Sequence, residues 1–213
     1  MADPVPQVRQ TRLPTEARQA EIVDALLRLA ETAEPTSITC AHLARAVGLT
    51  QGAVFRHFDT KDDIWRAAIR CIATRLLDTV DAAAARVDDP LDALAAVFHA
   101  HVEFIDRHPG VPRIVFHTLQ DSARADARRE VQALQQAYRG RIASLLEAAV
   151  TSGRLPQDLD RTAAATLFIG LVQALVMQAL AAGGEISIGT GADRVFALFI
   201  RGLGSGAQAP RTP

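Results

Sequence analysis

Most of the sequence between Thr15 and Leu203 consists of long segments rich in Ala, Leu, Arg, Asp and Glu, which short clusters of Gly, Pro, Asp and Thr interrupt. Residues of these types favour or tolerate the α-helix, and the alternating runs of Val, Ile and Thr that are typical of half-buried strands are nearly absent. With 213 residues the chain can also bury a full core. The sequence therefore predicts an all-α fold of about nine helices.

Helix start and stop signals divide the chain into four parts. Residues 1–14 hold three prolines and are expected to form a flexible arm. Residues 15–60 predict a small helix-turn-helix domain with its motif at 38–57, and residues 61–203 predict a larger helical domain. Residues 204–213 are rich in Gly, Pro and Ala and are expected to be disordered. In the larger domain we expect helices at about 61–87, 90–107, 109–120, 123–150, 158 or 160 to 182, and 192–203.

A first helix is expected from Thr15 to just before Pro35. The segment after it has the spacing that two helices need to cross at a tight turn. Such a motif requires a small residue at the crossing, a residue that tolerates a positive φ in the turn, and an apolar anchor in the second helix. Ala44, Gly48 and Val54 provide these in order. Thr39 and Thr50 are suited to cap the two helices, because a threonine oxygen can accept a hydrogen bond from the first turn. The segment therefore predicts a helix-turn-helix.

The face of the second helix opposite its buried anchors is expected to meet DNA. Small residues at positions 52 and 53 would let the backbone approach the floor of the major groove, and Gln51 could pair its amide with adenine, a contact that discriminates by about 1–3 kcal/mol. Lys61 lies in the first turn of the next helix, where the helix dipole favours a phosphate. The predicted DNA-contacting residues are Thr39, Thr50, Gln51, Gly52, Ala53, Phe55, Arg56, His57 and Lys61.

Charge gives no support for this interpretation. The net charge is −1, and the first 70 residues hold equal numbers of basic and acidic side chains. Two alternatives therefore remain open. The segment could be a helical hairpin inside an ordinary core, with its polar residues simply exposed to solvent, or the chain could be a helical module that binds a ligand or a protein without DNA.

The residues from Leu43 to Phe58, with Lys61 after them, closely resemble the N-terminal domain of the tetracycline-repressor (TetR) family. The resemblance is specific over the helix-turn-helix and its surroundings, and the remainder resembles the family only in length and helix count. It implies a homodimeric regulator, usually a repressor, whose divergent C-terminal domain binds an inducer. The chain departs from the family at Phe55, where tyrosine is usual. A phosphate-contacting hydroxyl is thus missing, and Phe55 could instead pack against sugar or a thymine methyl.

No charged residue occurs from Thr162 to Gly184, a stretch long enough to span a bilayer. Its many alanines and glycines, and the lack of a flanking Trp or Tyr, favour a soluble helix that is buried by its own domain and by a partner. We expect this helix and the last one to form a four-helix bundle with a second subunit, and packing in the intrachain core is the alternative. The predicted interface residues are Leu167, Gly170, Leu171, Ala174, Leu175, Gln178, Phe196, Phe199 and Ile200.

The family resemblance places a ligand pocket among the middle helices, against the helix that begins at Lys61. His101 and Tyr138 are the best candidates to line it, because each has a polar tip on an otherwise apolar face, whereas the others are equally good core residues. Since Lys61 and the segment 65–69 share one helix, we expect an effector to tilt this helix and spread the two recognition helices. The candidates are Trp65, Ile69, Phe98, His101, Phe104, Ile105, Phe116, Tyr138, Ile142, Phe168 and Met177.

Other functional classes find little support in the sequence. It has no HExxH motif, Gly-rich phosphate loop or nucleophile–base set, so we expect neither an enzyme nor a cofactor. No metal site is predicted, because Cys40 and Cys71 lack metal-ligand spacing, and we favour small buried thiols over a redox pair. The expected partners are a palindromic DNA operator, a second copy of the chain and an unidentified small effector, with no membrane. The N-terminus lacks an apolar signal core, which favours the cytoplasm.

Overall fold

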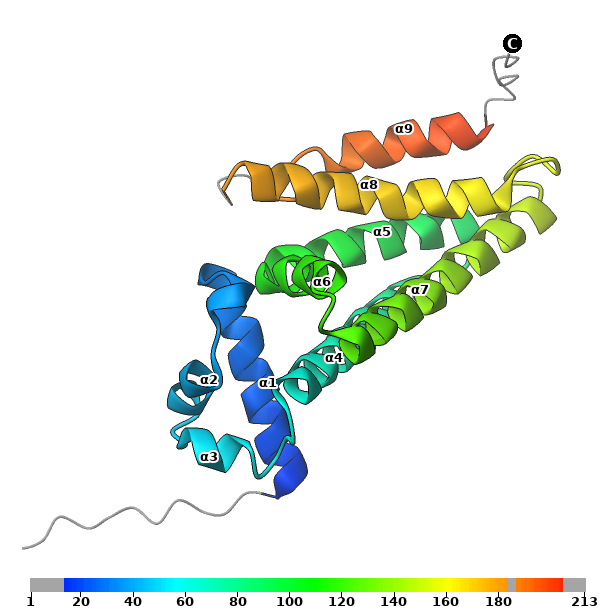
Figure 1. Ribbon diagram of the computed structural model, residues 1–213. Helices are drawn as coiled ribbons and strands as arrows, with labels where there is room; N and C mark the ends of the chain where they lie inside the picture. Colours follow the sequence, from blue (N-terminus) through cyan, green and yellow to red (C-terminus); the bar gives the residue numbers. More distant parts are fainter. Residues whose placement is uncertain (1–13, 184–186, 205–213) are drawn as a thin grey trace, which may run out of the picture.

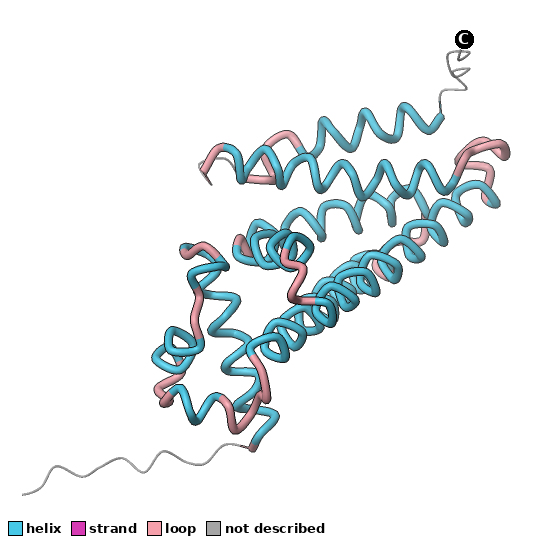
Figure 2. The backbone as a smooth tube through the Cα atoms, viewed as in Figure 1, coloured by secondary structure: helices cyan, strands magenta, loops and turns pink. Residues whose placement is uncertain are grey.

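The computed structural model describes residues 14–183 and 187–204, and these residues are helical apart from turns and loops (Figures 1 and 2). Within these ranges there are nine α-helices, one short 3-10 helix and no strand. The prediction of an all-α fold is therefore confirmed. The predicted arm and tail lie outside the described residues, except for Pro14 and Gly204.

The first three α-helices form a small unit at one end of the molecule (Figure 1). α1 spans Thr15–Thr32, and the 3-10 turn Pro35–Ser37 leads to α2 (Cys40–Ala46) and α3 (Gln51–Val54). α1 contacts α2, and α2 contacts α3. Helices as short as α2 and α3 are not stable alone, so the core that they share with α1 holds them in place. The fully buried side chains of this core include Ile22, Leu26, Leu43 and Val54.

The remaining six helices form an elongated body. α4 runs from the N-terminal unit into the body, where it lies against α5 and α7. α8 lies on α7 and α9 lies on α8, so these last two helices form the layer farthest from α2 and α3 (Figure 1). The bounds are α4 Lys61–Ala84, α5 Pro90–Arg107, α6 Gly110–Gln120, α7 Ala125–Thr151, α8 Arg161–Ala181 and α9 Ala192–Gly204.

Side-chain caps explain where two of the body helices begin. The Thr60 hydroxyl oxygen accepts a hydrogen bond from the N–H of Asp63 (3.1 Å), and the Asp63 carboxylate accepts one from the N–H of Thr60 (3.0 Å). This reciprocal pair begins α4. Asp160 accepts a hydrogen bond from the N–H of Ala163 (2.9 Å). The sequence left Asp158 and Asp160 as possible caps of α8, and Asp160 is the one that caps it. Each such cap stabilises a helix by about 1 kcal/mol.

The helix bounds agree with the predicted ones to within a few residues. α4 ends at Ala84, three residues before the predicted end, and α7 begins at Ala125. The later start of α7 has a local cause. The side chain of Asp121 accepts a hydrogen bond from the N–H of Ala123 (3.0 Å), which holds these residues in a turn instead of a helix.

α8 combines an apolar sequence with limited burial. By length and composition it is the one helix of the described residues that could cross a membrane, yet only a third of its most apolar window is buried within the chain. Core helices of soluble proteins pass the same test. Leu167 and Met177 on α8 are 52% and 54% exposed, so one face of this helix has no cover from the part of the chain that is described.

Candidate DNA-binding surface and ligand cavity

Backbone hydrogen bonds fix the turn between α2 and α3. Gly48 has a φ of 67°, in the left-handed region that glycine adopts most easily. The N–H of Leu49 donates to the carbonyl of Ala44 (2.8 Å), and the N–H of Gly48 donates to that of Arg45 (3.3 Å). This pair of bonds is the Schellman motif, which ends a helix and redirects the chain. It sets the direction in which the chain leaves α2 toward α3.

Buried contacts on both sides hold the α3 segment. Ala44 and Val54, the predicted crossing residue and anchor, are 2% and 0% exposed, and α2 and α3 are in contact. From α1, the side-chain amide of Gln19 donates a hydrogen bond to the carbonyl of His57 (2.7 Å). The segment from α3 to His57 is therefore attached to α2 at its start and to α1 at its end.

Both predicted threonine caps are present. Thr50 accepts a hydrogen bond from the N–H of Ala53 (3.2 Å) at the start of α3. Thr39 accepts one from the N–H of His42 (3.2 Å) at the start of α2, and the His42 ring accepts one from the N–H of Thr39 (3.4 Å). Because these bonds occupy the first turns, both helices begin where the sequence predicted.

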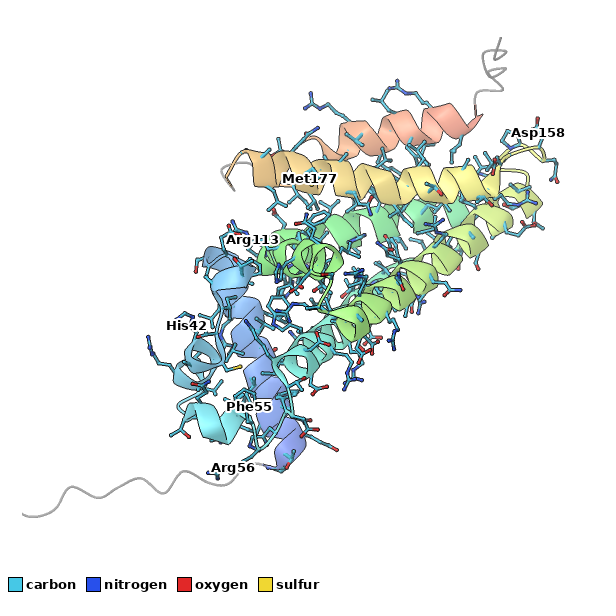
Figure 3. All side chains as sticks on the ribbon, in the orientation of Figure 1. His42, Phe55, Arg56, Arg113, Asp158 and Met177 are labelled. Carbon is cyan, nitrogen blue, oxygen red and sulfur yellow. The ribbon has the colours of Figure 1, made fainter. Side chains whose placement is uncertain are left out.

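α3 and the two residues after it carry five of the nine predicted DNA-contacting residues. Gln51, Gly52 and Arg56 are exposed, Phe55 keeps 40% of its surface exposed, and Ala53 is half-buried. Figure 3 shows Phe55 and Arg56 at the end of the molecule that is remote from α8 and α9. A methyl group added to Gly52 would meet no atom within 4 Å. Glycine costs a helix about 1 kcal/mol relative to alanine, and no described neighbour requires glycine at this position.

The remaining predicted contacts lie at the edges of this segment. Thr39 and Thr50 are exposed, whereas His57 and Lys61 are half-buried. Nδ1 of His57 is buried and has no hydrogen-bond partner among the described residues. Burial lowers the pKa of Lys61, and nearby Arg124 lowers it further. We define the α3 surface as Gln51, Gly52, Phe55 and Arg56, with Lys61 set back beside it.

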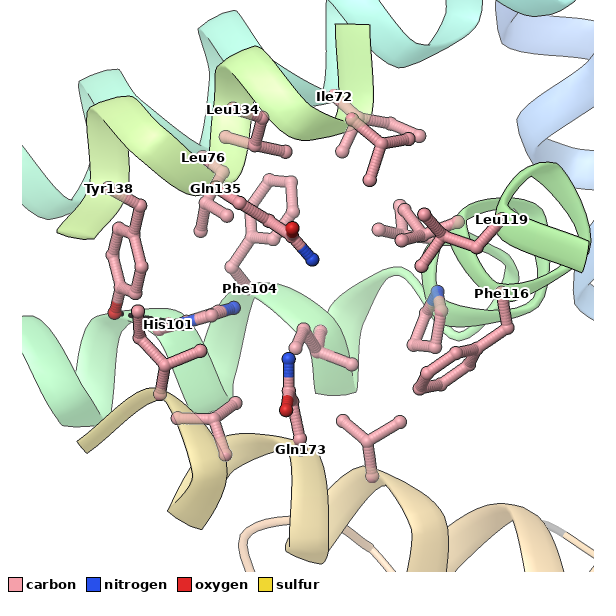
Figure 4. A pocket seen from close by; sticks show the side chains of 18 residues that line it. Ile72, Leu76, His101, Phe104, Phe116, Leu119, Leu134, Gln135, Tyr138 and Gln173 are labelled. Carbon is pink, nitrogen blue, oxygen red and sulfur yellow. Dashed lines mark hydrogen bonds between the residues drawn. The ribbon is translucent and has the colours of Figure 1, made fainter. Parts of the chain in front are cut away.

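A cavity of about 130 Å³ lies within the body, and α4, α5, α6, α7 and α8 all contribute to its walls (Figure 4). Its surface is mainly apolar, with a few polar groups that turn inward. Such a site is typical of the binding of a small molecule. Five of the predicted pocket residues line it, namely His101, Phe104, Ile105, Phe116 and Tyr138.

The other six predicted pocket residues lie outside the cavity lining. Met177 is 54% exposed on the uncovered face of α8, so the prediction for it was wrong. The remaining five side chains fill the core around the cavity. Each belongs to an apolar stripe that also packs one helix on the next, so their residue types could not distinguish core from wall. They are Trp65, Ile69, Phe98, Ile142 and Phe168.

Sequence reasoning missed most of the aliphatic wall and two amides. Gln135 lies one helical turn before Tyr138 on α7, and this spacing could have identified it. Gln173 follows Ile169 by four residues on α8, but a charge-free helix gives no sign of which face turns inward. The missed residues are Ile72, Leu76, Val111, Pro112, Val115, Leu119, Val131, Leu134, Gln135, Ile169, Val172, Gln173 and Val176.

The two best sequence candidates, His101 and Tyr138, meet in the cavity wall. Nδ1 of His101 lies 2.9 Å from the hydroxyl oxygen of Tyr138, and Figure 4 shows this hydrogen bond at one end of the cavity. Burial lowers the pKa of His101 to about 4 and raises the pKa of Tyr138. Both side chains are therefore neutral at neutral pH.

Two family models match the chain in sequence. The model of bacterial regulatory proteins of the tetR family matches residues 22–68, and the model of the tetracyclin repressor-like C-terminal domain matches residues 87–203. The second match alone covers more than half of the chain. The chain belongs to the TetR family. Residues 22–68 thus correspond to the regulatory domain of this family, and residues 87–203 correspond to its repressor-like C-terminal domain.

Individual proteins match this TetR-family chain over different lengths. The nucleoid occlusion factor SlmA of Vibrio campbellii is 33% identical over 99 residues, which are 46% of this chain and 50% of that protein. The chain thus matches about half the length of this curated relative. The fatty acid degradation regulator FadR from Bacillus halodurans has a TM-score of 0.79 at 17% identity, over 91% of this chain and 98% of that one. FadR from Bacillus subtilis, in complex with stearoyl-CoA, has a TM-score of 0.76 at 17% identity, over 86% and 98%.

α9 also carries an exposed apolar side chain in this TetR-family fold. Leu198 of α9 is 61% exposed, and among the predicted interface residues Leu167, Ala174 and Gln178 are exposed. Gly170, Leu171 and Ile200 are half-buried. The prediction was wrong for Leu175, Phe196 and Phe199, which are at most 8% exposed. The aromatic stripe of α9 turns inward instead, where the ring of Phe196 lies 5.0 Å from that of Phe98.

α6 connects the cavity to the DNA-binding unit. Val111, Pro112 and Phe116 of α6 line the cavity, while its first residue, Gly110, packs on the last turns of α1. A methyl group on Gly110 would lie 2.5 Å from the carbonyl oxygen of Leu27 and 3.0 Å from a backbone nitrogen of α1. The close approach of α6 to α1 therefore requires glycine at this position.

A second connection lies at the corner between α6 and α7. The guanidinium carbon of Arg124 lies 4.1 Å from the ring centroid of Trp65, which is fully buried on α4. Nε of Arg124 lies 2.9 Å from a carboxylate oxygen of Asp121, and its Nη1 lies 3.8 Å from Asp62 in the first turn of α4. A cation over an indole face is attractive, and more so away from water. Arg124 thus attaches the α6–α7 corner to the start of α4.

Proposed function

We propose that the protein is a transcriptional repressor that binds a palindromic DNA operator as a homodimer and leaves it when a small molecule occupies the cavity. The α3 surface is the observation that best supports DNA binding. Gln51 can pair with adenine and Arg56 with guanine or a phosphate, while Gly52 allows the helix backbone to approach the groove. Phe55 offers an apolar contact to sugar or to a thymine methyl.

The exposed apolar side chains of α8 and α9 support a second copy of the chain as the partner. One helix-turn-helix contacts only a few base pairs, and a dimer gains affinity by contacting two half-sites about 34–36 Å apart or at a related spacing. Leu167, Met177 and Leu198 are each more than half exposed on α8 and α9. Two such helices from each copy would bury these side chains in a four-helix bundle.

Release by an effector is supported by the two helices that connect the cavity with the DNA-binding unit. α4 runs from Lys61, beside the α3 surface, to Ile72 and Leu76 in the cavity wall. α6 has the cavity on one side and α1 on the other. An effector that binds best to a conformer with α4 and α6 displaced would lower the population that fits both half-sites, and by no more than its differential affinity for that conformer.

The named relatives support separate parts of the proposal. The stearoyl-CoA bound to FadR from Bacillus subtilis supports a small molecule as the ligand of this fold. SlmA supports DNA binding, and its description as a nucleoid occlusion factor makes a DNA-bound role outside transcription the alternative. Transcript levels at the genomic promoters nearest to the selected operator, measured with and without the protein, distinguish the two roles, because a repressor lowers these levels and a role outside transcription leaves them unchanged.

Selection of bound sequences from a random pool of double-stranded DNA tests the DNA-binding proposal directly. We expect a palindromic consensus with the protein bound as a dimer. The double variant Q51A/R56A should lose at least about thirtyfold in affinity for that consensus, because it removes two base contacts from each half-site and each contributes about 1–3 kcal/mol.

The matched control replaces the same residue types on α7, where Gln132 and Arg139 are exposed. Q132A/R139A should bind the consensus as the wild type does. A random pool that shows no enrichment, or an equal loss of affinity in both double variants, would overturn the proposal and favour a ligand-binding module without DNA.

A further inference from the structure

The cavity lining is polar at a few positions but holds no charged side chain among the described residues. None of the described side chains that line it carries a formal charge, although charged residues make up 22% of the whole sequence. Its polar groups belong to His101, Gln135, Tyr138 and Gln173, and all the other lining side chains are aliphatic, aromatic or proline. A buried ligand charge would find no counter-ion on these walls.

The His101–Tyr138 pair is neutral and leaves hydrogen-bonding capacity for a ligand. If the Tyr138 hydroxyl donates to Nδ1 of His101, then Nε2 carries the proton and can donate to a third group. If Nδ1 donates instead, Nε2 becomes an acceptor. Figure 4 shows the His101 ring with its far edge toward the centre of the cavity. In either tautomer the pair offers a neutral partner to a polar group there.

Two amides face the same space from other helices. Figure 4 shows the side-chain amide of Gln135 entering from α7 and that of Gln173 entering from α8. An amide both donates and accepts hydrogen bonds, so the two glutamines can satisfy a hydroxyl, a carbonyl or an ester, whichever atoms it presents. His101, Gln135 and Gln173 thus provide polar groups on an otherwise apolar lining, where Gln135 is half-buried and Gln173 is exposed.

We propose that the cavity binds an uncharged, mostly apolar molecule whose single hydrogen-bonding group lies between His101, Gln135 and Gln173. Burying an ionised group without a partner costs far more free energy than burying a neutral group that keeps its hydrogen bonds. The walls therefore disfavour carboxylates and ammonium ions, which would lose hydration without gaining a counter-ion. The inference rests on the proposed function in one respect only, namely that the cavity is the effector site.

The volume of the cavity suggests suitable probes. At about 130 Å³ it is comparable to cavities that hold a benzene ring. Benzyl alcohol, benzoate and benzylammonium share that ring and differ in the charge of one substituent. Isothermal titration of the full-length protein with each probe at pH 7.5 should show benzyl alcohol binding at least tenfold more tightly than either ion.

A variant pair tests the role of the amides. Q135L should weaken benzyl alcohol by about tenfold and leave toluene at least as tightly bound, because the apolar space remains while the polar partner is lost. Q132L makes the same substitution on the exposed side of α7 and should bind both probes as the wild type does. Circular dichroism checks that each variant is folded.

Each other outcome overturns the inference. Benzoate or benzylammonium binding as tightly as benzyl alcohol would show that the walls do not select against charge, and no binding of any probe would show that the cavity is not a site for such molecules. Equal losses of benzyl alcohol affinity in Q135L and Q132L would show that the Gln135 amide does not contact the ligand. Operator selection is measured without any probe, so a failure here leaves the proposed DNA binding unaffected.

Discussion

The α3 surface and the cavity are built in different ways. The α3 surface comes from one short stretch of sequence, and the Schellman turn at Gly48 and the caps of Thr39 and Thr50 fix it through the backbone. The cavity takes its walls from five helices, which meet through apolar side chains. A surface fixed by local hydrogen bonds keeps its shape when the body moves, whereas walls that meet by packing can adopt a second arrangement. The difference suggests a rigid DNA-contacting element at one end and an adjustable site at the other, joined by α4 and α6.

Mild acid should destabilise the cavity side of the molecule most. Burial lowers the pKa of His101 to about 4, from an ordinary value of 6.5, so the unfolded chain binds the proton first as the pH falls. The stability from the neutral ring is complete above about pH 6.5 and is lost as the pH falls toward 4, by up to about 3 kcal/mol. Urea unfolding at pH 7, 6 and 5 measures this loss.

The variant H101Q isolates that contribution. Glutamine can still form a hydrogen bond with Tyr138 and does not titrate between pH 7 and 5. The free energy of unfolding of H101Q should therefore fall by about 2 kcal/mol less than that of the wild type over this range. Equal pH slopes in the two proteins would show that His101 is not held neutral by burial.

Substitution of Gly110 should damage the connection between the two regions. A methyl group there meets the carbonyl of Leu27 at 2.5 Å, so α6 and α1 must move apart. We expect G110A to lower the free energy of unfolding by about 1–3 kcal/mol and to weaken the effect of a bound ligand on operator affinity. Chemical unfolding and operator binding with and without benzyl alcohol measure the two effects.

Gly140 provides the control for this substitution. It also lies within a helix, but an added methyl group would meet nothing within 4 Å. G140A should therefore be neutral or stabilise the protein by up to about 1 kcal/mol, with the ligand effect unchanged. If G110A behaved like G140A, α6 would not need its close approach to α1.

The same difference explains what the sequence could and could not predict. The α2–α3 turn depends on Ala44, Gly48 and Val54, which lie close together, so the local pattern determined the geometry that the structure has. Helix bounds were predictable for the same reason, since caps and breakers act on their own turn. Gly110 gave no such signal, because its constraint comes from a backbone carbonyl of α1 more than eighty residues earlier in the sequence.

The layer of α8 and α9 shows most clearly what the sequence could not predict. Phe196 and Phe199 form an apolar stripe that suits an interface and a core equally well. The ring of Phe168 lies against both, and the ring of Phe98 lies against Phe196, so the stripe faces inward. The prediction for Met177 was wrong in the opposite direction. This apolar side chain was predicted to line the pocket, but it is exposed. Residue type and helical spacing define a stripe, but the neighbouring helix decides what the stripe contacts.

Removing the cap of α3 should affect the α3 surface and spare the cavity. T50A loses the acceptor for the N–H of Ala53, so we expect a loss of about 1 kcal/mol in the stability of α3 and faster hydrogen exchange of its amides. Operator affinity should fall, while benzyl alcohol binding stays at the wild-type level. T74A, at an exposed position of α4, should change stability by less than about 0.5 kcal/mol. A parallel loss of benzyl alcohol binding in T50A would show that the Thr50 cap also supports the cavity walls, which would contradict a locally fixed α3 surface.

The smallest expected change in stability gives the sharpest separation of folding from DNA binding. Because the space around Gly52 is open, G52A should raise the free energy of unfolding by about 0.5–1 kcal/mol, as alanine does in an unobstructed helix. Operator affinity should fall at the same time, because the added methyl group would lie between the α3 backbone and the floor of the major groove. G140A provides the matched gain in stability without a change in DNA binding. If G52A gained stability and kept full operator affinity, α3 would not approach the bases at Gly52, and the side chains of Gln51 and Arg56 would have to reach the DNA from a greater distance.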